Sequence, residues 1–238
     1  MSDLNHVAII LDGNRRWAKE HGLSGDSSVY KHGGLAIAPV VEAIYKSGAQ
    51  CISLWVGSYS NLVNRSKILL KALDHAYEAK FNELADSETI REQQVKIEII
   101  GEWRELLSES CVAAADRAIE ATKNFAKRTL VILVGYDGVR ERGAAVQKLL
   151  QQNSPTPSDI LQAEQLLRSN SWTGHLPNVD LIIRTGAWQD PHNSAGFLGF
   201  LTTDSQYSFP PVLWPDLTKE MVSEICDDYL SRERRYGK

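Results

Sequence analysis

The sequence contains few cysteines, and none of them are paired at metal-binding spacing. Cys51, Cys111 and Cys226 stand far apart in a chain of 238 residues. Disulfide-stabilised folds and zinc sites normally need several cysteines at short, regular spacings. We therefore expect three reduced cysteines that serve in packing, and neither a disulfide framework nor a zinc site.

Long hydrophobic runs and an excess of positive charge are also missing. No stretch approaches the roughly 18 to 20 apolar residues of a membrane-spanning helix, and the first residues lack the charged-then-apolar layout of a signal peptide. The formal net charge is −4, which argues against a nucleic-acid partner but not against a local cationic pocket. The sequence thus predicts a cytoplasmic protein that neither spans a membrane nor binds nucleic acid.

Short apolar runs alternate with longer helical patterns along the whole chain. The runs are rich in β-branched residues and leucine, and they lack polar alternation, which is typical of parallel strands covered on both faces. We expect strands at residues 7–11, 51–56, 95–100, 130–134 and 181–183, and helices at about 34–47, 66–86, 105–126, 138–151, 158–169 and 217–233. This order predicts a single α/β domain over residues 1–238, with a central, mostly parallel sheet surrounded by helices.

Turns that contain glycine follow each of the five predicted strands. They comprise residues 12–14, 57–61, 101–102, 135–138 and 184–186. In an open parallel sheet the carboxyl ends of the strands lie at one edge, and ligands bind there. These turns are therefore the predicted walls of a functional site.

The first of these turns, Asp12-Gly13-Asn14, is followed directly by Arg15 and Arg16. A glycine lets the backbone approach a ligand closely, and arginines donate charge-assisted hydrogen bonds to phosphate oxygens. A carboxylate beside them would repel a phosphate unless a cation lies between the two, and Mg²⁺ commonly bridges one carboxylate and a diphosphate. The turn thus indicates a magnesium diphosphate site, although a helix cap beside a solvated basic turn has the same spacing.

The segment HVAIILDGNRRWAKEHG, residues 6–22, closely resembles the first signature of the cis-prenyltransferases, the undecaprenyl and dehydrodolichyl diphosphate synthase family. Further segments resemble this family in the same order, namely GSYSNLVNRS, GYDGVR, VDLIIRTG, VLWPDL and SRERRYG. The resemblance implies a hydrophobic tunnel for a prenyl tail, isoprenoid diphosphate substrates, Mg²⁺ as cofactor and a homodimer. The trans-prenyltransferases are all-helical and carry aspartate-rich motifs, and the sequence has no D-D-x-x-D.

The resemblance also implies a role for each matching residue. Asp12 would be the catalytic aspartate and the Mg²⁺ ligand, with Asn14 and Asn61 completing the catalytic set. Arg184 would bind the diphosphate of the second substrate. The other implied substrate-binding residues are Gly13, Arg15, Arg16, Trp17, Lys31, His32, Ser58, Arg65, Ser194, Arg235 and Gly237. The last two match a C-terminal Arg-x-Gly that reaches across the dimer into the neighbouring site.

The chain departs from the family pattern where the second substrate should bind. After the arginine at 184, the family has an Arg-x-Ser that binds isopentenyl diphosphate and then a glutamate that binds Mg²⁺. Here Asn193 and Ala195 stand near the Arg and the Ser, and Gln206 stands in place of the glutamate. An amide is a poor substitute for a carboxylate on Mg²⁺. The residues that could compensate in an altered geometry are Asp190, His192, Ser194 and Asp204.

Smaller departures affect the first half of the chain. Ser60 and Leu62 replace a glutamate and a tryptophan of the second motif, and one extra residue precedes Arg65. Either Lys31 or His32 stands for the family histidine. His32 is equally compatible with a loop histidine that transfers no proton.

The donor half of the predicted site contains Asp12, Asn14, Arg16 and Arg65, and the acceptor half contains Arg184 and the residues that follow it. The donor half thus matches the family better than the acceptor half. This favours an enzyme that ionises an allylic diphosphate, such as dimethylallyl diphosphate, and transfers the prenyl group to a non-standard acceptor. The acceptor would be a second allylic diphosphate, as in the lavandulyl and cyclolavandulyl diphosphate synthases, and the product would be branched or cyclic. Two alternatives stay open: an ordinary cis chain-elongating synthase that uses isopentenyl diphosphate, and a non-catalytic partner subunit of a prenyltransferase heteromer.

Overall fold

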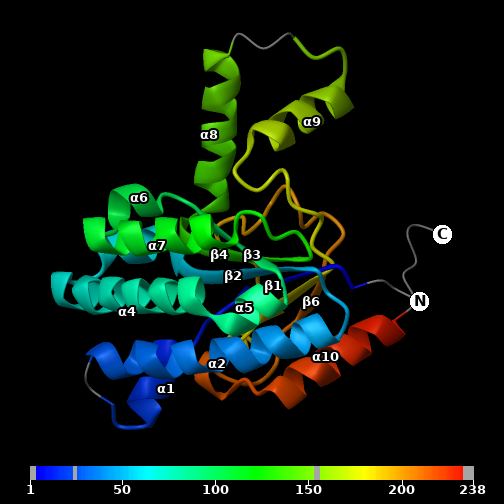
Figure 1. Cartoon of the computed structure of the whole chain (residues 1–238). Coiled ribbons are helices and arrows are strands. Elements are labelled where there is room, and N and C mark those ends of the chain that lie inside the picture. Colours follow the sequence, from blue (N-terminus) through cyan, green and yellow to red (C-terminus); the bar gives the residue numbers. More distant parts are fainter. Residues whose placement is uncertain (1–3, 24–25, 153–155, 233–238) are drawn as a thin grey trace.

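Six strands form one sheet in the computed structural model, which describes residues 4–23, 26–152 and 156–232 (Figure 1). The strands are β1 (His6–Ile10), β2 (Cys51–Ser58), β3 (Val95–Ile100), β4 (Arg128–Tyr136), β5 (Leu181–Arg184) and β6 (Gln206–Ser208). Their order in the sheet is β3-β4-β2-β1-β5-β6, and every adjacent pair is parallel. The predicted α/β architecture is therefore confirmed, with a sheet that is parallel throughout.

Helices connect the strands and follow the last of them. They are α1 (Asn14–Glu20), α2 (Asp26–Lys46), α3 (Tyr59–Asn64), α4 (Lys67–Asp86), α5 (Glu88–Glu92), α6 (Trp103–Leu106), α7 (Glu109–Thr122), α8 (Gly138–Gln151), α9 (Ile160–Asn170), the 3-10 helix η1 (Trp214–Asp216) and α10 (Lys219–Ser231). Ser58, Ser66, Ser108 and Asp137 stand directly before α3, α4, α7 and α8, and their side chains accept hydrogen bonds from first-turn N–H groups. Such caps contribute about 1 kcal/mol each and fix where the helix begins.

The two faces of the sheet are covered differently. Helices α2, α4, α7 and α10 pack on one face, where Ile44, Phe81 and Tyr229 are fully buried against strand residues such as Ile9. The other face is covered by the chain between α9 and β6, through residues such as Phe197. Helices α8 and α9 project from the body as an arm (Figure 1).

The structure differs from the predicted elements in five places. Strand β6 was not expected because it is only three residues long and half-buried, without an apolar run. Helix α2 begins at Asp26, upstream of the expected start, and continues through Gly33 and Gly34. The helix expected at 105–126 is two helices, because the chain is extended at Leu107 and Ser108. Helices α3 and α5 are additional. No helix among the described residues is long and apolar enough to cross a bilayer.

Candidate active site

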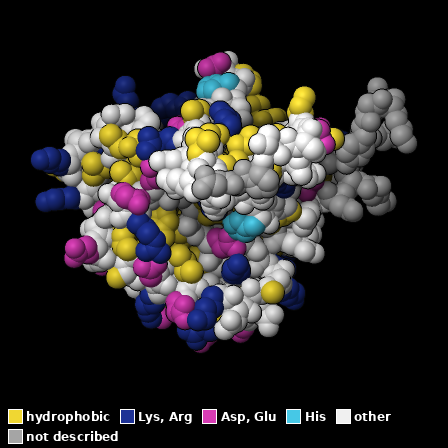
Figure 2. Space-filling view, turned by 90° about the horizontal axis from the view of Figure 1, so that it is seen from above, with side chains coloured by type: hydrophobic (Ala, Val, Ile, Leu, Met, Phe, Trp, Pro, Cys, Tyr) yellow, Lys and Arg dark blue, Asp and Glu magenta, His cyan; other side chains and the backbone are white. Residues whose placement is uncertain are grey.

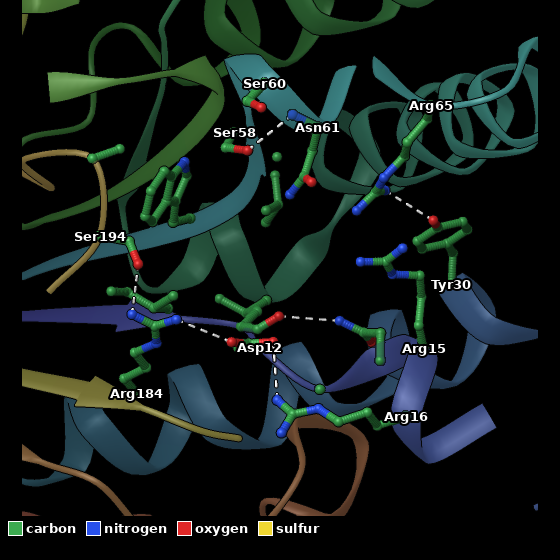
Figure 3. A pocket seen from close by; sticks show the side chains of 18 of the residues that line it. Asp12, Arg15, Arg16, Tyr30, Ser58, Ser60, Asn61, Arg65, Arg184 and Ser194 are labelled. Atoms are coloured by element: carbon green, nitrogen blue, oxygen red, sulfur yellow. Dashed lines mark hydrogen bonds and ion pairs between the residues drawn. The ribbon is translucent and has the colours of Figure 1, made fainter. Parts of the chain in front are cut away.

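A pocket of about 710 Å³ opens at the carboxyl ends of β1, β2, β4 and β5. Four of the five predicted turns contribute to its wall, whereas residues 101 and 102 after β3 do not. The predicted site residues that line it are Asp12, Gly13, Asn14, Arg15, Arg16, Ser58, Asn61, Arg65, Arg184 and Ser194. Figure 3 labels eight of these residues, and their side chains converge from opposite sides of the pocket.

The carboxylate of Asp12 lies between two arginines. Arg184 Nη2 donates to Asp12 Oδ2 at 3.1 Å, and Arg16 Nη2 lies 3.3 Å from Asp12 Oδ1 (Figure 3). The side chain of Asp12 is 37% exposed and that of Arg184 only 9%. Each carboxylate oxygen is thus held by one arginine, while the side chain stays accessible from the pocket.

The turn after β5 holds the Asp12 backbone in place. Thr185 Oγ1 donates to the Asp12 carbonyl at 2.7 Å, and Arg16 Nη2 donates to the Gly186 carbonyl at 2.6 Å. Gly186 has a φ of +68°, and a Cβ there would lie 2.4 Å from Arg16 Nη2. Only glycine therefore allows this turn to approach the first motif so closely.

Arg184 also organises the loop that follows it. Its Nη1 donates to the His192 carbonyl at 2.9 Å and to Ser194 Oγ at 2.7 Å. The loop is held from the other side, because Gly138 N–H donates to the Ala195 carbonyl at 3.0 Å. Ser194 and Ala195 consequently reach the pocket wall.

Helix α1 begins at the pocket with a glycine as its N-cap. Gly13 has a φ of +110°, and no side chain caps the helix. A Cβ at Gly13 would lie 2.8 Å from Leu213, so the turn packs directly against the segment before η1. The close approach at Gly13 is thus to Leu213, and its approach to a ligand stays a prediction.

Asn14 lies where the polar pocket meets an apolar one. Its Nδ2 donates to the Leu11 carbonyl at 3.1 Å, and its Oδ1 packs so tightly on α2 that a Cβ at Gly33 would lie 2.2 Å away. Trp214 Nε1 donates to the Gly33 carbonyl at 2.8 Å. The amide of Asn14 is therefore fixed by its neighbours on both sides.

The far end of the pocket is built by α3 and the residues around it. Ser58 caps α3 by accepting from Asn61 N–H at 3.1 Å, which places the Asn61 side chain on the wall. Arg65 Nη1 donates to the hydroxyl of Tyr30 at 2.9 Å, and Arg15 lies beside this pair (Figure 3). Two arginines thus meet at this end from different elements.

A second cavity of about 430 Å³ adjoins the pocket between α2, α4 and the sheet. Both cavities are lined by Leu11, Asn14, Tyr30 and Val56. The second one is mainly apolar, with residues such as Leu73, Phe81, Leu84, Leu130, Ile132 and Trp214 in its wall. Burial raises the pKa of Tyr77 in this wall, so its hydroxyl stays protonated and donates to the Val56 carbonyl at 2.9 Å.

Three predicted substrate-binding residues lie away from the pocket. Trp17 is buried, and its Nε1 donates to Asp216 Oδ1 at 2.6 Å, so its observed role is to join α1 to η1. His32 lies beside Trp17, with ring centroids 5.0 Å apart, and lines neither cavity. Lys31 lines the apolar cavity only. Arg235 and Gly237 lie outside the described residues.

The residues near Gln206 do not assemble a metal site. Gln206 lies at the start of β6 opposite Leu181, and its Oε1 accepts from Arg232 at 2.8 Å. Within residues 4–23, 26–152 and 156–232, no group of three or more His, Cys, Asp or Glu side chains could hold a metal ion. Of the residues that could compensate, Asp190 and His192 lie 3.3 Å apart and Ser194 accepts from Arg184, but Asp190, His192 and Asp204 do not form a group of three that could hold a metal ion.

The pocket is also lined by residues outside the predicted turns, namely Lys19, Tyr30 and Trp55, and by Ser60 and Asp137, which belong to predicted turns but were not among the predicted site residues. Lys19 is one helical turn beyond Arg15 and Arg16, so helical spacing could have found it. Trp55 was assigned to a buried strand, and nothing in the local sequence indicates that its ring reaches a pocket wall. Tyr30 reaches the pocket because of the way α2 packs, and this packing cannot be predicted from the sequence.

Comparisons with known proteins agree with this geometry. A family model described as "Putative undecaprenyl diphosphate synthase" matches residues 10–237. A Methanopyrus kandleri protein named tritrans,polycis-undecaprenyl-diphosphate synthase (geranylgeranyl-diphosphate specific) is 32% identical over 98% of this chain and 84% of its own length. An isoprenyl transferase of Rickettsia sibirica is 31% identical over the full length of both chains.

A solved structure gives the same result for the fold. The lavandulyl diphosphate synthase of Lavandula x intermedia, in complex with dimethylallyl diphosphate, superimposes with a TM-score of 0.85 and 25% identity over 98% of each chain. Together with the matched family model and the pocket at the carboxyl edge of a parallel sheet, this shows that the chain is a prenyltransferase enzyme and belongs to the cis-prenyltransferase family.

Proposed function

We propose that this enzyme transfers a prenyl group from an allylic diphosphate, such as dimethylallyl diphosphate, to a second allylic diphosphate. The observation that carries the proposal is the composition of the acceptor half of the pocket. Arg184 is its cation, and after Arg184 the sequence has no Lys or Arg before Lys219. Ser194 is the loop side chain that reaches both Arg184 and the pocket wall. This half lacks the Arg-x-Ser and the glutamate that bind isopentenyl diphosphate and Mg²⁺ in the family pattern.

The donor half is much richer in positive charge. Lys19, Arg15, Arg16 and Arg65 all line it, and cations directed at a leaving diphosphate favour the transition state of its departure. The adjoining apolar cavity offers the prenyl tail a place to bury its hydrocarbon surface, at about 25 cal/mol per Å². The head and tail of an allylic diphosphate therefore each meet a matching environment.

The proposed reaction conserves all atoms of the two substrates. The bond between C1 and the diphosphate oxygen of the donor breaks, and the diphosphate leaves with the electron pair. The internal double bond of the second allylic diphosphate then forms a bond to C1, which leaves a tertiary cation. Loss of a proton to the departed diphosphate gives a branched diphosphate. If the double bond of the donor first attacks the tertiary cation, a ring forms that carries a new cation, and this cation then loses the proton to the diphosphate.

The donor set fits a magnesium ion held mainly by substrate. Mg²⁺ usually binds through one or two carboxylates together with phosphate oxygens and water. Asp12 and Asp137 are the carboxylates that line the pocket, and the Asp137 Oδ1 already caps α8. Asp12 would therefore hold the ion, with Ser58 and Asn61 as further oxygen donors. When bound, Mg²⁺ would neutralise charge that develops on the leaving diphosphate.

An ordinary chain-elongating synthase is the second candidate. It is supported by relatives such as the Rickettsia sibirica isoprenyl transferase, which this chain matches over its full length. The lavandulyl diphosphate synthase, whose structure is a complex with dimethylallyl diphosphate, supports transfer to a second allylic diphosphate. A non-catalytic partner subunit is not supported, because Asp12 and the surrounding arginines form a complete donor half.

The test is to incubate the purified chain with Mg²⁺ and dimethylallyl diphosphate, with and without isopentenyl diphosphate, and to identify products by mass spectrometry. We expect a branched or cyclic C10 diphosphate from dimethylallyl diphosphate alone. Isopentenyl diphosphate should neither lengthen this product nor be required for it. A linear polyprenyl series that forms only when isopentenyl diphosphate is present would decide for the elongating synthase.

We further propose a homodimer in which Arg235 and Gly237 of each tail complete the partner's site. The arm formed by α8 and α9 supports this state, because it exposes Leu150 (75%), Ile160 (86%) and Leu161 (75%). Figure 2 views the molecule from the side of this arm and shows hydrophobic side chains exposed among charged ones. Isolated apolar side chains are common on surfaces, but several on one projecting arm favour an interface. Sedimentation of the wild type and of Leu150→Lys should show a dimer that the substitution weakens.

A further inference from the structure

Three buried side-chain nitrogens lack a hydrogen-bond partner in the described part of the chain. They are Trp55 Nε1, Arg65 Nε and Arg184 Nε. All three residues line the active-site pocket. Each of the three atoms is a donor, and no buried side-chain acceptor among the described residues is left unpaired. An unpaired buried donor lowers stability, so this local shortage of acceptors indicates a ligand rich in oxygen atoms.

Trp55 is the one uncharged member of this set, and the strand register gives its position. Ile10 of β1 pairs with Trp55 on β2 and with Arg184 on β5. Trp55 and Arg184 therefore lie on either side of β1 at the same level, and two strand spacings put their Cα atoms about 10 Å apart. Ile10 and Trp55 pack on the same face of the sheet as Ile182, and Arg184 follows Ile182 by two residues, so its side chain shares that face.

Arg65 belongs to a different part of the pocket. It follows α3 and pairs with Tyr30, at the end of the pocket opposite Arg184 and Ser194 (Figure 3). Trp55 goes with the acceptor half of the pocket because Phe197, in the same loop as Ser194, stacks on its ring.

The indole ring has little freedom to find another acceptor. It stacks on Phe197 with ring centroids 5.0 Å apart at 15°, and Tyr136 meets its edge at 6.2 Å. Phe197 is fully buried and belongs to the same loop as Ser194. Because the ring is held on a face and an edge, the direction of Nε1–H is fixed before substrate binds.

We propose that the Nε1–H of Trp55 donates a hydrogen bond to a diphosphate oxygen of the second substrate. This inference rests on the proposed function and names one further residue of its acceptor site. The Nε1 atom is buried, so a side chain that covers it moves aside when the substrate oxygen binds. A neutral donor on the same face of the sheet as Arg184 gives this half an additional contact where the sequence has no second arginine.

The test uses Trp55→Phe, which keeps an aromatic ring against Phe197 and removes only the N–H. Calorimetric titration of the full chain with inorganic diphosphate and Mg²⁺ should show two sites, and the dissociation constant of the weaker, acceptor-half site should be about tenfold higher than in the wild type. Trp103→Phe is the matched control, because Trp103 Nε1 donates to the Ile99 carbonyl outside the pocket. The control should bind diphosphate like the wild type.

Nuclear magnetic resonance gives a second readout, the indole N–H resonance of Trp55, which diphosphate would not shift if Trp55 had only a structural role. The chain has six tryptophans, and the indole resonance missing in Trp55→Phe identifies Trp55. Diphosphate should shift this resonance downfield in the wild type. An unmoved resonance together with unchanged affinity in Trp55→Phe would overturn the inference.

Two arginine variants distinguish failure of the inference about Trp55 from failure of the proposed function. In Arg15→Gln, which weakens the donor half, adding Trp55→Phe should still raise the dissociation constant about tenfold. In Arg184→Gln, which weakens the acceptor half, adding Trp55→Phe should have no further effect, since both residues act on one ligand. The opposite pattern would assign Trp55 to the donor half and overturn the inference. A wild type that binds no diphosphate would overturn the proposed function as well.

Discussion

Arg184 and Asp12 meet through a 3.1 Å hydrogen bond although 172 residues separate them in the sequence. They meet because β5 and β1 are adjacent and parallel, so the residues at their carboxyl ends become neighbours. The guanidinium of Arg184 also reaches Ser194. The aspartate of the donor half and the arginine of the acceptor half are thus parts of one network, and a change in either should affect both substrates.

Replacing Asp12 by Ala should reduce turnover by at least ~100-fold, the scale of removing a key electrostatic group from an active site. The protein should stay folded, because Asp12 is partly exposed and its ion pairs with Arg16 and Arg184 are not part of the apolar core. Product formation and thermal unfolding should be measured on the same sample. A folded variant with near-normal turnover would contradict the assignment of Asp12 as the catalytic carboxylate.

Two adjacent glycines on α2 offer a matched pair for testing Asn14. In Gly33→Ala the new Cβ would lie 2.2 Å from Asn14 Oδ1, so the amide must move, whereas a Cβ at Gly34 meets nothing within 4 Å. We expect Gly33→Ala to lower kcat/KM about ten- to hundredfold, as misplacement of a catalytic group by about 1 Å does. Gly34 lines the apolar cavity, so the comparison uses the short substrate dimethylallyl diphosphate, with which Gly34→Ala should keep its activity. This variant should also gain slightly in stability, since Ala favours helix. Equal activities of the two variants would show that Asn14 needs no fixed position.

Much of this arrangement follows from the sequence because it depends on strand ends. Asp12 and Arg184 each follow an apolar run, and parallel strands bring such positions to one edge. The pairing of Trp17 with Asp216 could not be predicted, since it depends on how α1 packs against a segment 199 residues later. The same holds for Trp55, whose place in the pocket depends on a register between strands. Local patterns therefore predict which turns form the site, but not which side chains the packing brings to its wall.

His6 should make stability depend on pH. It is fully buried, and Nδ1 donates to the Pro177 carbonyl while Nε2 accepts from Ser53 Oγ. Burial lowers the pKa of His6 from 6.5 to about 4, against smaller opposing effects of Pro177 and Asp180. The unfolded chain therefore binds a proton between these values that the folded chain does not. The contribution of His6 to stability is complete above pH 6.5 and is lost as the pH falls toward 4.

Denaturant unfolding at several pH values can measure this effect. The free energy of unfolding should fall by about 2 kcal/mol between pH 7 and pH 5 because of His6 alone. His6→Gln should remove this part of the slope, although it is less stable at pH 7. His75→Gln, at an exposed histidine on α4, should leave the slope unchanged. A wild-type slope that survives in His6→Gln would show that another group titrates in this range.

The apolar cavity between α2 and α4 should decide which allylic donors the enzyme accepts. Ala76 lines this cavity, and a phenyl ring there would occupy space that a long prenyl tail needs. Ala76→Phe should therefore raise the KM of geranyl and farnesyl diphosphate about tenfold or more, in proportion to the hydrocarbon that can no longer be buried. Dimethylallyl diphosphate has only five carbons beside its diphosphate, so its KM should change less than twofold. Ala113→Phe, on the exposed face of α7, is the control for a general effect of a new aromatic residue. If all three donors lost affinity equally in Ala76→Phe, the substitution would distort the pocket in general, and the cavity would not be the binding site of the tail.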